Sequence, residues 1–96
     1  MNKYELTFIV DPTLEDAKKE AYIEEVKGII AGAAGEVSDT EVWGLKKLAY
    51  PILKKSEGYF VVLHFTANPE LPKELSRRLR ISDNCMRHII VNLDEK

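Results

Sequence analysis

The chain of 96 residues has little cysteine and little histidine: Cys85 is the single cysteine, and His64 and His88 are the two histidines. One cysteine excludes a disulfide within the chain and a metal cluster made of cysteines alone. Apolar runs are short, because a run such as residues 59–63 falls far below the roughly 20 residues of a membrane-spanning helix. Residues 1–5 carry no apolar signal segment. We therefore expect a cytoplasmic protein that does not enter a membrane.

The sequence also lacks a recognisable catalytic arrangement. Thr7 and Ser38 offer hydroxyls, but no base is identifiable near either, and both are interpreted as structural. The segment after the first predicted strand reads Asp-Pro-Thr, which is not a glycine-rich phosphate-binding loop. Cys85 and His88 stand three positions apart, yet a metal site there needs further ligands that the sequence does not clearly supply. We expect no enzyme, no metal site, no cofactor and no small-molecule substrate.

The composition is that of an ordinary soluble domain, with 45% hydrophobic and 31% charged residues, and the length fits one domain over residues 1–96. The charges are unevenly distributed. Residues 1–45 contain 4 basic and 10 acidic residues, whereas residues 46–92 contain 9 basic and 4 acidic residues. Exposed charges more than about 8 Å apart are largely screened from one another at physiological salt. The second half can therefore bind phosphate although the net charge of the chain is −2.

Hydrophobic periodicity predicts six elements. Residues 4–10 alternate apolar and polar side chains, which predicts a strand. Thr13 and Asp16 approximate a capping box, and a helix follows that ends at Gly32 and Gly35, with Lys19 on its solvent face. The remaining predicted elements are a strand over residues 36–52 with a bulge at Gly44, a turn over residues 54–58, a strand over residues 59–66, a helix capped by Asn68 and buried through Leu71, Leu75 and Leu79, and a strand over residues 86–93.

The predicted order is strand, helix, strand, strand, helix, strand. This order indicates an α+β fold, the ferredoxin-like split βαββαβ arrangement, in which a four-stranded antiparallel sheet carries both helices on one face. The other face of the sheet is left open or becomes an interface. Enzymes, regulators and RNA-binding proteins all use this fold, so it does not decide the function.

Residues 43–52, with the sequence WGLKKLAYPI, place Lys46 and Lys47 side by side in a predicted strand. Side chains alternate along a strand, so the two lysines point to opposite faces unless the bulge at Gly44 turns both outward. Positive charges on a stiff backbone beside aromatic residues indicate an anionic partner. The aromatic residues of this segment are themselves interpreted as packing residues.

Residues 57–65 partly echo the aromatic strand of an RNA-recognition motif, whose rings stack on bases. The segment lacks the leading basic residue and the second glycine of that motif. Tyr59 and Phe65 also fall on the predicted core face. We expect them to pack in the core.

The segment WGLKKLAYPI, followed at a distance by RISDNCMRHIIV over residues 80–91, resembles the bacterial small-subunit (30S) ribosomal protein six family. The opening Lys3-Tyr4-Glu5 is similar to the first strand of that family, and the resemblance covers nearly the whole chain. It implies a structural constituent of the small ribosomal subunit. Such a protein binds 16S ribosomal RNA in its central domain, forms a heterodimer with ribosomal protein eighteen and assists assembly of the platform.

In such a role the basic residues Lys3, Lys46, Lys47, Arg80 and Arg87 are expected to pair with phosphates, and His88 is a further candidate for RNA contact. Lys54 and Lys55 are interpreted as a solvated turn, and Arg77 and Arg78 are left open between solvent and RNA. The chain departs from the family pattern where relatives carry basic or other polar residues, at Asn2, Leu53, Ser82 and Asn92. Because few positive charges remain, we expect the isolated protein to bind RNA weakly and the heterodimer to bind it well.

A second class stays open, namely a small-molecule regulatory module of the same fold that dimerises through its open sheet face. Such a module predicts a self-complementary patch and a pocket at the dimer boundary, whereas RNA binding predicts a steep salt dependence. An acylphosphatase-like hydrolase is disfavoured because no arginine follows the first strand in a phosphate-binding loop.

Overall fold

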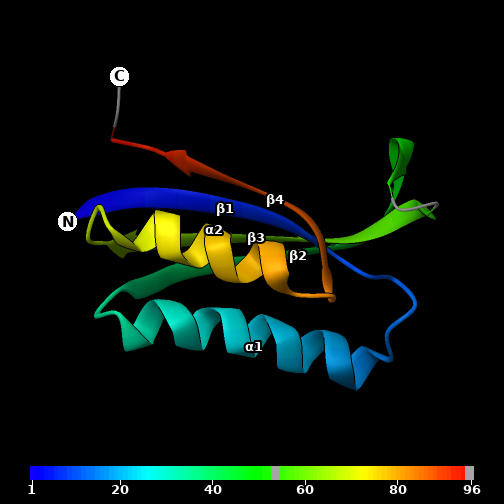
Figure 1. Ribbon diagram of the computed structural model, residues 1–96, viewed down its shortest axis with the longest axis horizontal. Helices are drawn as coiled ribbons and strands as arrows, with labels where there is room; N and C mark the ends of the chain where they lie inside the picture. Colours follow the sequence, from blue (N-terminus) through cyan, green and yellow to red (C-terminus); the bar gives the residue numbers. More distant parts are fainter. Residues whose placement is uncertain (53–54, 95–96) are drawn as a thin grey trace.

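The computed structural model describes residues 1–52 and 55–94, and for residues 49–52 it describes the backbone alone. The chain forms the predicted series of elements (Figure 1). They are β1 (Asn2–Val10), α1 (Asp16–Gly32), β2 (Glu36–Ile52), β3 (Lys55–Ala67), α2 (Leu71–Ile81) and β4 (Cys85–Asn92). The predictions for Leu53 and Lys54 and for the side chain of Tyr50 lie outside the described residues. Neither described helix is long and apolar enough to cross a membrane.

The four strands form one antiparallel sheet in the order β2-β3-β1-β4. Both helices pack on the same face of this sheet (Figure 1). The predicted ferredoxin-like split βαββαβ fold is confirmed. Strands β2 and β4 are the outer strands, so each leaves one edge unpaired within the described sheet.

The core lies between the sheet and the two helices and follows the predicted periodicity. The stripe of Leu71, Leu75 and Leu79 on α2 is buried, as the spacing of four predicts. Tyr59, which was expected in the core, is half-buried and packs against it. The most deeply buried side chains are Leu6, Phe8 and Val10 of β1, Val26 and Ile30 of α1, Val61, Leu63 and Phe65 of β3, and Leu75 and Leu79 of α2.

Lys19 is buried, so its expected place on the solvent face of α1 is wrong. Its ammonium nitrogen lies 4.9 Å from the centre of the Tyr59 ring and 3.5 Å from Oδ1 of Asp16. A lysine can cover apolar surface with its aliphatic stem while its charge meets a ring face and a carboxylate. Helical spacing alone did not predict this position.

Both helices begin differently from the prediction. The N-cap of α1 is Glu15, and the hydroxyl of Thr13 instead donates to Oδ1 of Asp11 at 2.7 Å. The predicted capping box is therefore wrong, because Thr13 stabilises the turn before the helix. The N-cap of α2 is Glu70 and not Asn68, whose backbone carbonyl accepts from the first helical N–H.

Gly44 forms the predicted bulge in β2. Its φ is 81°, a conformation that glycine adopts without a Cβ clash, and the register against β3 shifts there. Beyond the bulge, Lys46 lies opposite Gly58 and Lys47 lies opposite Glu57. Because successive residues of a strand alternate, the two lysines point to opposite faces of the sheet.

Candidate nucleic-acid interface

One face of the sheet is turned away from the helices and is called the open face here. Leu6 and Phe8 of β1 are fully buried on the helix side, so the residues between and beside them point to the open face. The register adds their neighbours on the other strands. The open face includes Lys3, Glu5, Thr7 and Ile9 of β1, Phe60, Val62, His64 and Thr66 of β3, Arg87, Ile89 and Val91 of β4, and Glu36, Asp39, Glu41, Trp43 and Lys46 of β2.

Lys46 and Arg87 lie at the same end of the open face. Arg87 pairs with Ile9, whose other neighbour is Phe60, and Lys46 pairs with Gly58 close to that row. Both side chains belong to exposed residues. They stand on the two outer strands, which are three strand spacings or about 14 Å apart. Two predicted RNA-binding residues are thus brought to one surface from distant parts of the sequence.

Lys3 lies at the other end of the open face. It pairs with Thr66, about 20 Å along the strand from the row of Arg87. The backbone N–H of Lys3 donates to Oδ2 of Asp94 at 2.7 Å, so this end of β1 lies beside the C-terminal segment. The sheet therefore does not bring Lys3 together with Lys46 and Arg87.

The other three predicted residues lie on the helix side. Lys47 is on outer strand β2, while Arg80 of α2 and His88 of β4 lie near the opposite edge of the sheet. Nε2 of His88 is 2.7 Å from Oγ of Ser76, which joins β4 to α2. Burial, followed by the charge of Arg80, lowers the pKa of His88 below 6.5. His88 is therefore uncharged at neutral pH and is suited to hydrogen bonding rather than to neutralising a phosphate.

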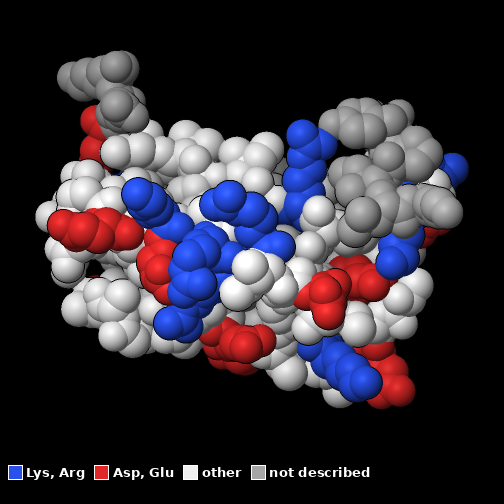
Figure 2. All heavy atoms as spheres, viewed as in Figure 1, with Lys and Arg blue, Asp and Glu red and all other residues white. Residues whose placement is uncertain are grey.

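Helix α2 carries more positive charge than the prediction assigned to it. Lys73, Arg77, Arg78 and Arg80 are all exposed, and Figure 2 shows basic side chains gathered over this helix. Glu74 accepts from Arg77 at 2.6 Å and from Arg78 at 3.0 Å. These hydrogen bonds, Arg77 first, lower the pKa of Glu74 to about 2. One carboxylate thus engages two arginines, and their spacing of three and four from Glu74 is visible in the sequence.

Lys73 was missed as a candidate residue. It lines a hollow of about 460 Å³ between α2 and β4, together with Ser76, His88 and Asn92. Lys73, Ser76 and Arg80 recur at helical spacing, which is the signal that places them on one side of α2. This side of α2 adjoins the outer strand that also carries Arg87.

Lys55 is not a solvated turn residue, because it begins β3 and pairs with Asp11. Its ammonium nitrogen lies 3.0 Å from Oδ2 of Asp11, and both side chains are largely covered. Burial by itself would raise the pKa of Asp11, but hydrogen bonds from Thr13 and Lys55 outweigh it and lower the pKa. Lys55 therefore holds the end of β1 against the β2–β3 hairpin.

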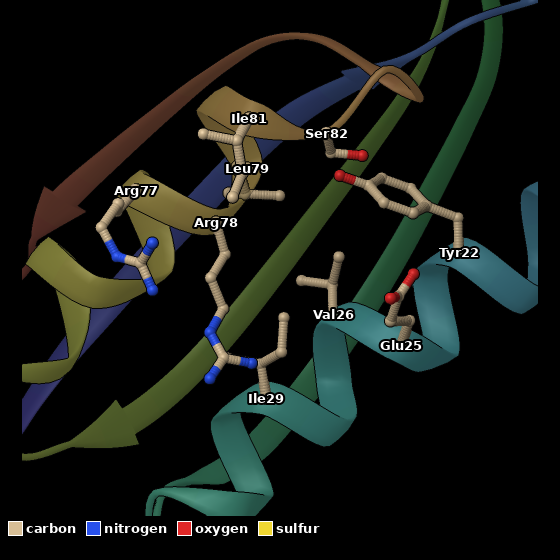
Figure 3. A pocket seen from close by; sticks show the side chains of 9 residues that line it. All are labelled: Tyr22, Glu25, Val26, Ile29, Arg77, Arg78, Leu79, Ile81 and Ser82. Carbon is tan, nitrogen blue, oxygen red and sulfur yellow. The ribbon is translucent and has the colours of Figure 1, made fainter.

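A second hollow of about 490 Å³ lies between the two helices (Figure 3). Tyr22 points its hydroxyl toward Ser82 at one end, and Glu25 faces the groove from α1 while Arg77 and Arg78 approach it from α2. Burial raises the pKa of Tyr22 to about 12, so this hydroxyl stays protonated at neutral pH. The groove offers shape and charge but no arranged nucleophile and base among its lining residues.

Cys85 is a poor metal ligand in this environment. Burial raises the pKa of its thiol to about 11, and Sγ donates to the carbonyl of Arg87 at 3.4 Å. Metals bind the thiolate, which burial disfavours here. His88 hydrogen-bonds with Ser76 instead. The geometry gives no support to a metal site at Cys85 and His88.

Comparisons with known proteins point to one family. A family model described as Ribosomal protein S6 matches residues 3–92. The chain is 50% identical to the small ribosomal subunit protein bS6 of Clostridium beijerinckii over 92 residues, covering 96% of this chain and 97% of the relative. It is 47% identical to the bS6 protein of Clostridium perfringens, covering 99% and 100% of the two chains.

The crystal structure of the 30S ribosomal protein S6 from Thermotoga maritima superimposes with a TM-score of 0.90. The two chains are 29% identical, and the match covers 95% of this chain and 86% of the other. The sequence match spans nearly every element described above, and the fold agrees along the same length. The chain belongs to the bacterial ribosomal protein S6 family.

Proposed function

We propose that this chain binds the central domain of 16S ribosomal RNA together with small-subunit ribosomal protein eighteen and so assists assembly of the platform. Membership of the family already establishes the general role: the protein is a structural, non-enzymatic ribosomal protein, located in the cytoplasm as part of the ribosome. The observation that supports the finer part is the position of Lys46 and Arg87 at the same end of the open face.

The proposed RNA surface begins at Lys46 and Arg87 and continues around the β4 edge onto α2. Arg80 and Lys73 extend it there, on the side of α2 that meets His88. Cations spaced along a surface neutralise successive phosphates and release counterions, which gives affinity with little sequence reading. His88 and Ser76 add uncharged hydrogen-bonding groups within this surface. Lys3 contacts RNA only if the RNA reaches the far end of the open face, and Lys47 only if it bends around the β2 edge to the helix side.

We assign the open face between these charges to the partner protein. Ile89 and Val91 are exposed on β4, and Trp43 is half-exposed on β2, where its ring stacks on Phe60 with centroids 6.5 Å apart. Ile89 and Val91 are neighbours on one face of β4, and exposed apolar side chains that lie together in this way indicate an interaction site. Glu5, together with Asp39 and Glu41 of β2, lies beside them on the same face. A partner that itself binds RNA carries basic surface, which complements these carboxylates.

Filter binding of central-domain RNA, with and without ribosomal protein eighteen, tests this function. We expect the isolated chain to bind weakly, because few of its basic side chains share one surface, and the heterodimer to bind at least tenfold more tightly. The measurement is made at several salt concentrations, since phosphate contacts produce a linear fall of log affinity with log salt. Equal affinities with and without the partner would contradict the proposal.

Removing the carboxylate of Glu74 should strengthen RNA binding. Glu74→Gln releases Arg77 and Arg78 from the hydrogen bonds that now engage them. We expect a several-fold rise in affinity and a salt dependence steeper by roughly one to two phosphate contacts. Glu70→Gln is the matched control, because it removes an exposed carboxylate beside the same helix that makes no ion pair with these arginines. An equal gain in both variants would show that net charge alone matters.

A further inference from the structure

His64 lies in the middle of the open face among three carboxylates that come from both neighbouring strands. Glu5 of β1 and Asp39 of β2 are its direct cross-strand partners, and Glu41 follows on β2. Glu5, the pair Asp39 and Glu41, and His64 come from three distant stretches of the chain, so residue spacing alone does not group them.

The two ring nitrogens of His64 have different surroundings. Nε2 lies 3.0 Å from Oε2 of Glu5, within hydrogen-bond distance. Nδ1 faces Oδ2 of Asp39 at 3.7 Å and Oε2 of Glu41 at 3.8 Å, which is too far for a hydrogen bond to either. If Glu5 accepts a hydrogen bond from the Nε2–H of His64, the lone pair of Nδ1 points at the other two carboxylates. Three acceptor groups that converge without a donor are the arrangement a cation satisfies.

The distances between the three candidate ligand atoms fit a metal ion with ordinary metal–ligand bond lengths. Zinc bonds of about 2.0–2.2 Å at tetrahedral angles place neighbouring ligand atoms roughly 3.3–3.6 Å apart. The two distances from Nδ1 are close to this range, and all three ligand atoms lie within 4.8 Å of one another. The side chains of His64, Asp39 and Glu41 are 26%, 61% and 46% exposed, so small rotations close the gap and water can complete the coordination.

We propose that Nδ1 of His64 and the carboxylates of Asp39 and Glu41 bind a divalent transition metal ion of the Zn²⁺ class. Glu5 is the positioning residue, because a carboxylate on the second ring nitrogen fixes the tautomer and orientation of a ligating histidine. One nitrogen and two carboxylate oxygens suit Zn²⁺ better than Mg²⁺ or Ca²⁺, which prefer oxygen ligands alone. The inference concerns the isolated chain and does not depend on RNA or on a partner protein.

Calorimetric titration of the isolated 96-residue chain with ZnCl₂ tests the site. We expect one saturable site that an excess of MgCl₂ does not displace. His64→Gln should remove it, whereas His88→Gln and Glu36→Gln should retain it, because the first changes the other histidine and the second another exposed carboxylate of β2. Glu5→Gln should weaken binding by roughly 10- to 100-fold. Circular dichroism confirms that each variant is folded.

Two results would overturn the proposal. The first is the lack of saturable binding at millimolar Zn²⁺, which would show that these three side chains do not form a metal site. The second is unchanged binding in His64→Gln, which would place the metal elsewhere. Neither result bears on RNA binding, which is measured separately and without added zinc.

Discussion

Replacing Lys46 and Arg87 together by glutamate is expected to lower the affinity for central-domain RNA by roughly 100-fold at moderate salt, because two phosphate contacts become two repulsions. Both residues stand at one end of the open face on outer strands, where substitution leaves the core untouched. The slope of log affinity against log salt should fall by about two. Filter binding of the heterodimer over a salt series measures both quantities.

The matched control is Lys47→Glu combined with Arg87→Glu. It makes the same change in net charge on the same strand, one position away, but Lys47 points to the helix side. We expect a clearly smaller loss of affinity than for Lys46→Glu with Arg87→Glu. Equal losses of affinity in the two double variants would mean that RNA binding depends on the total charge of the protein and not on the charges of the open face. Unchanged affinity in Lys46→Glu with Arg87→Glu would contradict the assignment of these contacts.

The bulge at Gly44 decides which lysine lies on the open face. Val42 lies opposite Val61, a core residue of β3, so it points to the helix side. In an unbroken strand Lys46 would share that side, because it is four residues further on. One extra residue at Gly44 reverses the alternation and turns Lys46 to the open face. The sequence predicted opposite faces for the two lysines, but the assignment of each face required the register.

Features that depend on local spacing were predictable, and features that depend on several strands were not. The leucine stripe of α2 and the bulge at Gly44 followed from residue types at fixed intervals. The burial of Lys19 against Tyr59 and the gathering of carboxylates around His64 depend on which strands lie side by side. For the same reason, the six predicted RNA-binding residues were assigned as one set although the structure divides them between two faces.

The sharing of Glu74 between two arginines shows a further limit of sequence reasoning. The spacing of three and four allows both pairs, but it does not say that one carboxylate serves both. The geometry changes the interpretation of the basic helix, because we expect Glu74 to compete with any phosphate for Arg77 and Arg78. Lys73 and Arg80, which do not contact Glu74, are then the more accessible cations of α2.

Ile89→Lys is expected to weaken the heterodimer strongly while leaving the fold intact. Ile89 is 57% exposed on the open face, along outer strand β4, so the substitution should change the free energy of unfolding by only about 0.5 kcal/mol. In the proposed interface the new ammonium group would be buried opposite a basic partner. Truncation of a central interface residue costs about 2 kcal/mol or more, and a buried unpaired charge costs further, so we expect at least a roughly 30-fold loss of affinity.

Ile81→Lys provides the control for this experiment. Ile81 is an equally large apolar residue, 71% exposed, but it ends α2 and lies outside the open face. Calorimetric titration with ribosomal protein eighteen should therefore give near wild-type affinity for Ile81→Lys and little or no binding for Ile89→Lys. If Ile89→Lys bound normally and Ile81→Lys did not, the partner would sit at the end of α2. The apolar side chains of the open face would then need another explanation, such as contact with a second copy of the chain, which sedimentation of the isolated protein would reveal.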